Sequence, residues 1–223
     1  MPTLLLPKRN FGLSEHMDDP SCDARRLENT YRHFALVNRA IAGWRGVYKR
    51  LILPQRPARL LDIGCGGGDL ARQLAIWAKR DGLELSITAI DPDPRALSFA
   101  RARPAPPTIK FIEAHASDLN ETFDVVISNH VLHHLTAEEV AALCATSARL
   151  ATNLAVHNDI RRSDLAYLGF SLTAPFFRNS FITYDGLRSI RRSFTRAELA
   201  ALAPAGWRVE RAFPYRNLLV YRP

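Results

Sequence analysis

The stretch RLLDIGCGGGDL, residues 59–70, decides the fold of this chain. Its first five residues, Arg59–Ile63, are short and apolar, which is typical of a buried strand. Four glycines then fall within five residues, and an apolar helical pattern starts at Leu70. A strand that turns into a helix through glycines leaves backbone N–H groups open to a ligand. The stretch therefore predicts a ligand-binding turn at the carboxyl end of a strand.

On either side of this turn, strand and helix patterns alternate. Further strands are predicted at 85–90, 109–113, 123–128 and 153–157, and helices at 69–79, 94–101 and 136–150. Two capping boxes, Thr136 with Glu139 and Thr195 with Glu198, mark helix starts. Residues 207–213 and 218–221 predict an antiparallel hairpin at one sheet edge. The alternation predicts an α/β fold, with a mostly parallel sheet covered by helices on both faces.

The remaining segments suggest a division of the chain. Residues 1–20 combine prolines and a glycine with little periodicity, and we expect a flexible leader there. Two helices over 21–56 predict an N-terminal helical cap, and 57–223 form the main domain. Within that domain, 160–193 break the rhythm and are rich in aromatic residues and arginine. They are either additional core or a lid insertion over a substrate, and we favour the lid.

Composition narrows the function classes. The chain has 223 residues, 47% hydrophobic and 23% charged, and a net charge of +8. No apolar run reaches the roughly 20 residues that a membrane span needs, so we expect a cytoplasmic protein without a span. The basic residues are scattered, which makes a nucleic-acid partner unlikely compared with a solvated surface. Three distant cysteines indicate neither a disulfide framework nor a metal site. The oligomeric state is unknown from sequence.

The acids around the glycine turn indicate the kind of ligand. Asp62 precedes the first glycine and Asp69 directly follows the last. Two carboxylates repel a pyrophosphate and suit a cationic ligand such as S-adenosylmethionine (SAM). Asp91 ends the second strand and can accept both ribose hydroxyls, a feature that NAD enzymes share. Asp118 can accept from the adenine amine, with the backbone of Leu119 beside the ring.

Four segments carry a resemblance: LLDIGCGGGDLA (60–71), ITAIDPDPRALSFAR (87–101), EAHASDL (113–119) and FDVVISNHVLHHL (123–135). They resemble the class I SAM-dependent methyltransferases, in the branch of quinone-biosynthesis and other small-molecule enzymes. The resemblance implies a Rossmann-like seven-stranded sheet with an antiparallel C-terminal strand, and SAM as cofactor. The cofactor-binding residues that follow are Asp62, Gly64, Cys65, Gly66, Gly68, Asp91, Pro92, Asp118, Leu119 and Asn129.

The residues after the fourth strand bear on the reaction. Asn129 and His130 stand where the family places residues beside the transferring methyl. The motifs of base-amine and arginine methylation are absent here. His130, His133 and Asp159 are the candidate catalytic bases. Asn129 is a poor ligand for a hard cation, so no metal is expected.

These observations predict methyl transfer from SAM to a small molecule. The acceptor atom is a phenol or quinol hydroxyl, or an activated ring carbon, of an aromatic or polyketide-like metabolite. Three alternatives stay open: an RNA methyltransferase, a non-catalytic SAM-binding module, and an NAD(P) oxidoreductase.

Overall fold

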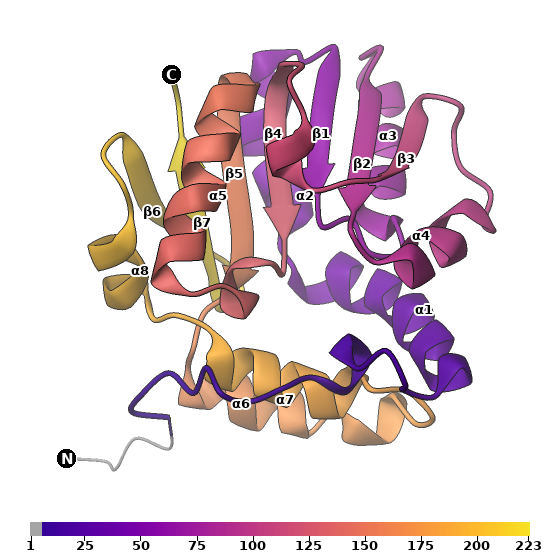
Figure 1. Ribbon diagram of the computed structural model, residues 1–223, viewed down its shortest axis with the longest axis vertical. Coiled ribbons are helices and arrows are strands. Elements are labelled where there is room, and N and C mark those ends of the chain that lie inside the picture. Colours follow the sequence, from indigo (N-terminus) through magenta and orange to yellow (C-terminus); the bar gives the residue numbers. More distant parts are fainter. Residues whose placement is uncertain (1–5) are drawn as a thin grey trace.

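The computed structural model describes residues 6–223. Seven strands form one sheet in the order β3-β2-β1-β4-β5-β7-β6 (Figure 1). β1 to β5 are parallel, and β7 runs antiparallel to both of its neighbours, so the predicted mostly parallel sheet with a reversed final strand is confirmed. The strands are β1 (Arg59–Ile63), β2 (Ser86–Asp91), β3 (Ile109–Glu113), β4 (Phe123–Asn129), β5 (Ala151–Ile160), β6 (Trp207–Ala212) and β7 (Arg216–Tyr221).

Helices cover both faces of this sheet, as the alternation predicts. α3 (Asp69–Arg80) and α4 (Pro94–Arg101) contribute to one core, and α5 (Ala137–Leu150) and α8 (Arg196–Leu202) to the other. Side chains of β1 alternate between the two cores, with Leu60 in the first and Leu61 in the second. Such alternation is the two-residue period of a strand buried on both faces.

The predicted N-terminal cap divides into two parts. α1 (Ala24–Ile41) lies beyond the carboxyl ends of the strands, where a cap is expected (Figure 1). The next segment packs with α3 in the first of the two cores; it consists of α2 (Trp44–Val47), η2 (Tyr48–Ile52) and η3 (Leu53–Gln55). Tyr48 and Ile52 are fully buried there. The second predicted helix is therefore part of the main core, because its large apolar side chains are buried against the sheet.

The prediction of a flexible leader needs correction over residues 6–20; residues 1–5 lie outside the described part. The segment follows α6 and α7 (Figure 1) and is held by hydrogen bonds. The backbone N–H of Leu6 donates to Asp164 Oδ1 at 3.0 Å, that of Asn10 to the Arg191 carbonyl at 3.0 Å, and that of His16 to Asp185 Oδ1 at 2.8 Å. These partners lie about 150 or more residues away, so no local pattern reveals them.

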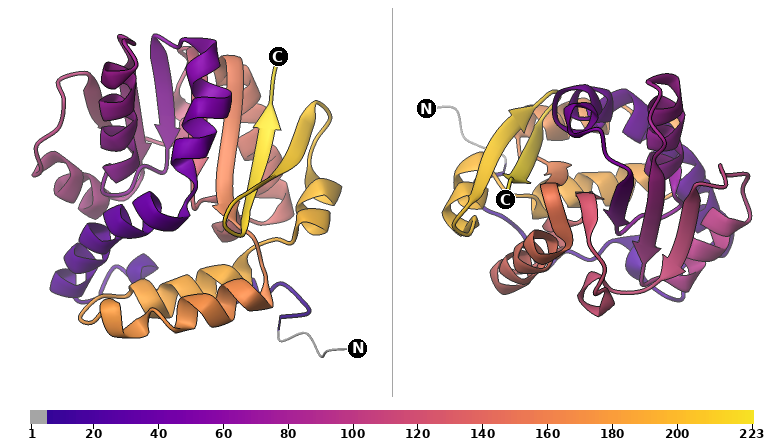
Figure 2. Two further views of the ribbon diagram at one scale, coloured as in Figure 1. Left: turned by 180° about the vertical axis from the view of Figure 1, so that it is seen from behind. Right: turned by 90° about the horizontal axis from the view of Figure 1, so that it is seen from above.

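The segment 160–193 folds into α6 (Asp164–Ser171), η6 (Ala174–Phe176) and α7 (Ile182–Arg192). Both helices lie beneath the carboxyl ends of the strands, near α1 (Figures 1 and 2). This is the place that a lid would occupy, and the lid role stays a prediction. Among the described residues, no helix combines the length and apolarity needed to cross a bilayer.

Candidate active site

A cavity of about 370 Å³ opens where β1, β2 and β4 end. Seven of the ten predicted cofactor-binding residues line it: Asp62, Gly64, Cys65, Gly66, Asp91, Pro92 and Asn129. The cavity lies at the carboxyl edge of the sheet, between strands on either side of β1, where α/β sheets bind ligands. The structure therefore brings together most of the predicted cofactor residues.

The glycine turn borders this cavity with bare backbone. Gly64 and Gly66 have φ values of 68° and 52°, a left-handed region that favours glycine. A Cβ at Gly66 would meet no atom within 4 Å, so its Cα faces open space. A Cβ at Gly64 would lie 2.7 Å from the Val131 side chain. Gly68 does not line the cavity, and a Cβ there would collide with the Phe111 ring, so its role in this structure is close packing.

Three carboxylates, those of Asp62, Asp69 and Asp91, line the cavity beside the glycine turn; Asp62 and Asp91 are buried and Asp69 is half-buried. Burial, together with Asp69 and Asp91, raises the Asp62 pKa well above its ordinary value. Asp62 Oδ2 has no hydrogen-bond partner among the described residues. Burial also raises the pKa values of Asp69 and Asp91, although Asp69 accepts from Asn38 Nδ2 at 2.9 Å and Asp91 Oδ2 from the Gly66 N–H at 2.8 Å. A cationic ligand would compensate this negative charge.

A chain of amides and a guanidinium holds Asn129 in place. Asn129 Nδ2 donates to Asn38 Oδ1 at 3.0 Å, and its Oδ1 accepts from Arg216 Nη2 at 3.0 Å. Arg216 is 3% exposed and also donates to Asn158 Oδ1 at 2.8 Å. Asn38 comes from α1 and Arg216 from β7, far from the glycine turn in sequence, and the sequence carries no motif that marks either residue.

A second cavity, of about 250 Å³, adjoins the first. Most of its lining is apolar and comes from α1, α6, α7 and the β6–β7 turn: Phe34, Val37, Ile41, Leu165, Phe170, Ile182, Ile190 and Pro214. Glu15, Phe34, His130 and Ser189 line both cavities. A ligand in the polar cavity and one in the apolar cavity would therefore meet at these four residues.

His130 lies at the junction in a strained conformation. Its φ is 61°, and its backbone N–H donates to the Asn158 carbonyl at 3.0 Å. Arg216 Nη1 is 3.3 Å from His130 Nε2. A guanidinium only donates, so Nε2 accepts and the neutral ring carries its hydrogen on Nδ1. Burial and the charge of Arg216 hold the His130 pKa well below its ordinary value.

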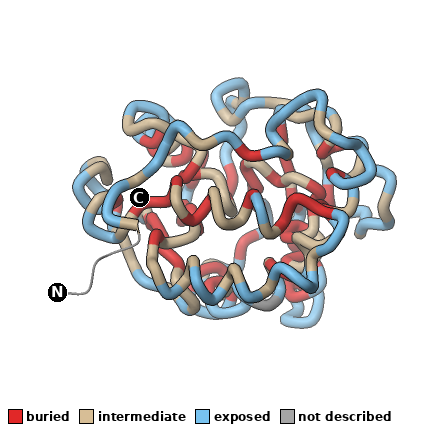
Figure 3. Tube along the Cα trace, turned by 90° about the horizontal axis from the view of Figure 1, so that it is seen from below, coloured by how far each residue is buried: buried red, intermediate tan, exposed pale blue. Residues whose placement is uncertain are grey.

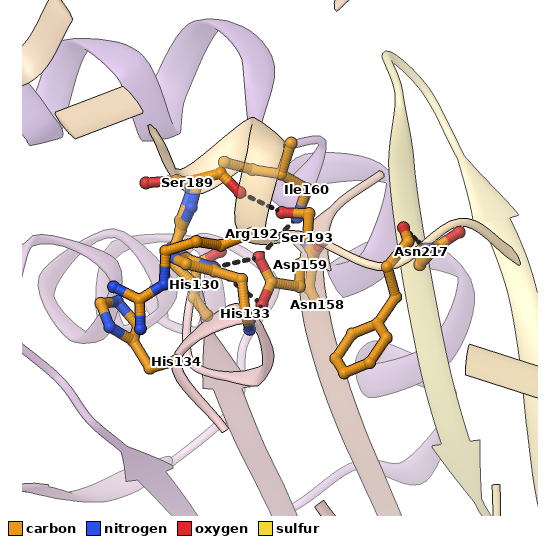
Figure 4. A network of polar contacts seen from close by, with 12 residues as sticks. His130, His133, His134, Asn158, Asp159, Ile160, Ser189, Arg192, Ser193 and Asn217 are labelled. Carbon is orange, nitrogen blue, oxygen red and sulfur yellow. Dashed lines mark hydrogen bonds and ion pairs between the residues drawn. The ribbon is translucent and has the colours of Figure 1, made fainter. Parts of the chain in front are cut away.

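His133 is held between the carboxylates of Asp159 and Glu15, and Figure 4 shows its contact with Asp159. Its Nδ1 donates to Asp159 Oδ1 at 2.8 Å, its backbone N–H donates to Asp159 Oδ2 at 2.8 Å, and its Nε2 is 3.4 Å from Glu15 Oε1. Burial alone would lower the His133 pKa, but Asp159 and Glu15 raise it to about 9. At neutral pH the ring is therefore an imidazolium, which cannot accept a proton.

Asp159 is one of the three predicted catalytic bases, but it lines neither cavity. A base must touch the acceptor, so this position does not suit the predicted role. Burial would raise its pKa, but the charge of His133 and their hydrogen bond keep it lowered. The Asp159 side chain instead fixes the orientation of His133, by accepting from its backbone N–H and from Nδ1. His134 is partly exposed, with its Nδ1 3.5 Å from Asp18 Oδ2.

Glu15 is a site residue that sequence reasoning missed. It comes from the segment that was expected to be a leader, yet it is 4% exposed and lines both cavities. Ser189 Oγ donates to Glu15 Oε1 at 2.8 Å, and Arg192 Nη1 is 3.8 Å from the same oxygen. Burial would raise the Glu15 pKa, but His133 and His134 lower it below its ordinary value. Glu15 is therefore ionised at the junction.

Asp118 and Leu119 are not brought to the first cavity. Asp118 is exposed, and its Oδ2 accepts from the His115 N–H at 3.2 Å within η4 (Ala116–Asp118). Leu119 packs against the core on the α5 side of the sheet. Asp118 thus caps its own turn in this structure, and contact of these two residues with adenine stays a prediction.

Two groups of side chains around His133 have the composition of a metal site. The possible ligand atoms of Glu15, His133 and His134 lie within 4.8 Å of one another, as do those of His130, His133 and Asp159. Both groups depend on His133, whose two ring nitrogens carry protons when it is charged. The expectation that the site uses no metal stays a prediction.

Comparisons with known proteins agree with this geometry. Residues 60–153 match a family described as a methyltransferase domain. The ubiquinone biosynthesis O-methyltransferase of Cereibacter sphaeroides is 38% identical over 98 residues, which are 42% of this chain and 37% of that protein. The malonyl-[acyl-carrier protein] O-methyltransferase of Anoxybacillus flavithermus is 33% identical over 111 residues, 48% of this chain and 39% of that protein. The chain thus spans less than two fifths of the length of either relative.

Solved structures extend the likeness over nearly the whole chain. The plantazolicin methyltransferase BpumL, in complex with S-adenosylhomocysteine (SAH), superposes with a TM-score of 0.66 over 93% of this chain and 92% of that one, at 16% identity. Human N-acetylserotonin methyltransferase, in complex with SAM, gives 0.65 over 95% of this chain and 63% of that one, also at 16% identity. At such identities these structures establish the fold. Residues 60–153 thus match a methyltransferase domain, and the chain has the fold of the SAM- and SAH-bound methyltransferases of known structure.

Proposed function

We propose that this protein transfers the methyl group of SAM to a hydroxyl of a hydrophobic aromatic small molecule. The observation that carries this proposal is the meeting of two unlike cavities at Glu15, Phe34, His130 and Ser189. The first cavity is lined by carboxylates and open glycine backbone, and the second is mainly apolar. A cofactor and an acceptor placed in them would come together at one point.

The residues of the first cavity fit SAM. Asp62 has a buried oxygen without a partner among the described residues, and the space above Gly66 is open to a ligand. Asp62 and Asp69 would hold the cationic methionine end, and Asp91 the ribose hydroxyls. When bound, SAM supplies a methyl group on a sulfonium that is already activated for transfer.

The protein's contribution to the reaction is alignment, exclusion of water and handling of one proton. Phe34 and His130 lie between the cavities and would position the acceptor oxygen. Glu15 is ionised and lines both cavities, so it can take the hydroxyl proton. His130 is neutral, but its one ring lone pair, at Nε2, accepts from Arg216, so it would instead donate its Nδ1–H to the acceptor oxygen. His133 is protonated and would stabilise negative charge on the acceptor oxygen. Transfer to an activated ring carbon, the other candidate, needs less help from these groups.

Calorimetric titration with SAM tests the cofactor assignment. Asp91→Asn should weaken SAM binding about 10- to 100-fold, because a hydrogen bond to a charged group contributes roughly 1.5–3 kcal/mol. Glu84→Gln is the control; this exposed carboxylate lines neither cavity, so its substitution should change affinity by less than about twofold. Unchanged affinity in Asp91→Asn, or binding of a nicotinamide dinucleotide in place of SAM, would contradict the proposal.

A panel of acceptors tests the reaction itself. Phenols and quinols, with and without alkyl chains, are incubated with SAM and the protein, and SAH release and product mass are measured. Release that depends on a hydroxyl supports O-methylation, and methylation of a compound whose hydroxyls are blocked points to carbon. Salt-sensitive retention of RNA, with RNA-dependent SAH release, would favour the RNA methyltransferase instead.

A further inference from the structure

Glu15, His133 and His134 come together where the N-terminal segment meets the turn after β4. The rings of His133 and His134 are 4.2 Å apart between their centroids (Figure 4). Glu15 Oε1 lies 3.4 Å from His133 Nε2, and Glu15 Oε2 lies 4.0 Å from His134 Nε2. With metal–ligand bonds of roughly 2.0–2.1 Å, two ligands of a tetrahedral ion lie about 3.4 Å apart. The first pair already has this spacing, and the second reaches it by a small movement of the half-buried His134 ring.

Each of the two histidines is oriented by a further carboxylate at its other ring nitrogen. His133 Nδ1 donates to Asp159 Oδ1 at 2.8 Å, and His134 Nδ1 is 3.5 Å from Asp18 Oδ2. A carboxylate only accepts, so Nδ1 carries a hydrogen in each ring and Nε2 is left for another partner. Histidines that bind metals almost always donate their second ring N–H to such a group. Both rings therefore have the orientation of metal ligands, with Nε2 toward Glu15.

The other group of possible ligands around His133 lacks these properties. His130 Nε2 accepts from Arg216 Nη1, so its lone pair is not available to a metal. Asp159 already accepts from the backbone N–H and Nδ1 of His133 and from the backbone N–H of Ile160. The Glu15 group is therefore the better candidate.

The three side chains of the Glu15 group are shielded from bulk solvent but reach the first cavity. Glu15 and His133 are 4% and 2% exposed, and all three side chains line that cavity. Figure 3 shows the buried positions of the chain from the side on which α6 and α7 lie. Three protein ligands leave one tetrahedral position free, as in catalytic zinc sites. Since Glu15 also lines the second cavity, the group adjoins the place where cofactor and acceptor would meet.

The fixed charges around these ligands nearly balance. The carboxylates are those of Glu15, Asp18, Asp159 and Asp185, and the guanidiniums are those of Arg9, Arg192 and Arg216. Glu198 and Arg162, which lie further out, pair with each other at 2.6 Å. The proton on His133 meets the one carboxylate in excess when no metal is bound. A divalent cation replaces that proton and leaves one positive charge, which an ionised acceptor oxygen would cancel.

We propose that Glu15, His133 and His134 bind one divalent transition-metal ion of the zinc class. Two imidazoles and a carboxylate suit Zn²⁺ and its neighbours, whereas Mg²⁺ and Ca²⁺ prefer sites made of oxygen ligands. The expectation of no metal was based on Asn129 as a ligand for a hard cation, and Asn129 takes no part in this site.

The consequence for the reaction rests on the proposed function. A cation at this position lies beside the acceptor hydroxyl, and its charge lowers the pKa of that hydroxyl. Glu15 is then a metal ligand and not the base, and the hydroxyl proton leaves to water. The acceptor class is a phenol whose ionised oxygen can contact the cation.

Metal titration tests the site without any acceptor. The full chain is freed of metal with a chelator and titrated at pH 8, with Zn²⁺ by calorimetry and with Co²⁺ by visible absorption, which reports tetrahedral coordination. The ligand variants are Glu15→Gln and His134→Gln. The matched control is His16→Gln, an exposed histidine next to Glu15 that lines neither cavity. Circular dichroism and thermal unfolding show that each variant is folded, and SAM binding is titrated separately.

The expected result is one Zn²⁺ per chain and the absorption of tetrahedral Co²⁺. Each ligand variant should bind Zn²⁺ at least about 100-fold more weakly, since loss of a mere outer partner of a ligand already costs about 10- to 100-fold. His16→Gln should bind like the unaltered chain. If a chain that binds SAM takes up no stoichiometric Zn²⁺, or if all three variants bind alike, the metal site is wrong and the proposed function stands. Zn²⁺ binding that the ligand variants lose, in a chain that does not bind SAM, would support the site and overturn the proposed function.

Discussion

Two histidines where the cavities meet have pKa values that differ from the ordinary value of a histidine, and in opposite directions. His130 and His133 are three positions apart, yet one is held neutral by Arg216 and the other charged by Asp159 and Glu15. The environment therefore gives two like side chains opposite charge states at neutral pH.

His133 should make stability depend on pH on the alkaline side. Its pKa is about 9 in the folded protein against an ordinary 6.5, so its contribution is fully present below pH 6.5 and is lost as pH rises through about 9. The loss should reach up to about 3 kcal/mol. Urea unfolding from pH 6 to 9 measures it for the unaltered chain and for His133→Gln, which should lack the slope in this range. Above pH 9 the thiols of Cys65 and Cys144, whose pKa values burial raises, add a loss of their own.

His157→Gln is the control for this measurement. His157 is also buried, but burial lowers its pKa to about 3, so it stays neutral throughout the alkaline range. Its substitution should leave the alkaline slope unchanged. A slope that persists in His133→Gln would show that another group is responsible.

Helix starts and turns that a short sequence motif predicts are present in the structure. The capping box at Thr136 has both of its hydrogen bonds, with Thr136 Oγ1 accepting from the Glu139 N–H at 3.2 Å and Glu139 Oε2 from the Thr136 N–H at 2.7 Å. The glycine turn likewise joins β1 to α3 where the sequence places it. Such features span only a few residues, so the chain encodes them in one short stretch.

Substitution of two glycines, Gly68 and Gly82, would distinguish the energetic cost of a left-handed backbone conformation from the cost of a steric collision. Gly68 and Gly82 have φ values of 70° and 71°, but a Cβ at Gly82 would meet nothing within 4 Å, whereas one at Gly68 would collide with Phe111. Gly82→Ala should cost about 1 kcal/mol from the left-handed conformation alone. Gly68→Ala should cost about 1–3 kcal/mol more, from overpacking. Urea unfolding compares the two, and equal losses would contradict the packing role of Gly68.

At the scale of the whole molecule, the two cavities are lined by segments that are far apart in the sequence. Glu15, Asn38, His130 and Arg216 come from the N-terminal segment, α1, the turn after β4, and β7. α1, α6, α7 and residues 6–20 together cover the carboxyl edge of the sheet (Figure 2). The N-terminal segment is therefore expected to serve the reaction.

Removal of residues 1–20 tests that expectation. The truncated chain loses Glu15 and the backbone donors to Asp185, so transfer should fall about 100-fold or more, the scale of a lost catalytic proton acceptor. SAM binding should fall much less, because Asp62, Asp69 and Asp91 remain. Glu15→Gln in the full chain keeps the segment in place; if it retains full activity, the segment's part in the reaction is structural.

The sheet, the glycine turn and the acids beside it can be predicted from the sequence alone, because each depends on residues adjacent along the chain or on a regular period. Seven of the ten residues predicted to bind the cofactor line one cavity, since the carboxyl ends of parallel strands necessarily meet at one edge. The tertiary structure alone shows that Asp118 caps its own turn, that Asp159 hydrogen-bonds His133, and that Glu15, Asn38 and Arg216 line the two cavities. Their contacts join residues that are mostly tens to more than a hundred positions apart, and burial and partner charges set their protonation, so no local pattern in the chain encodes them.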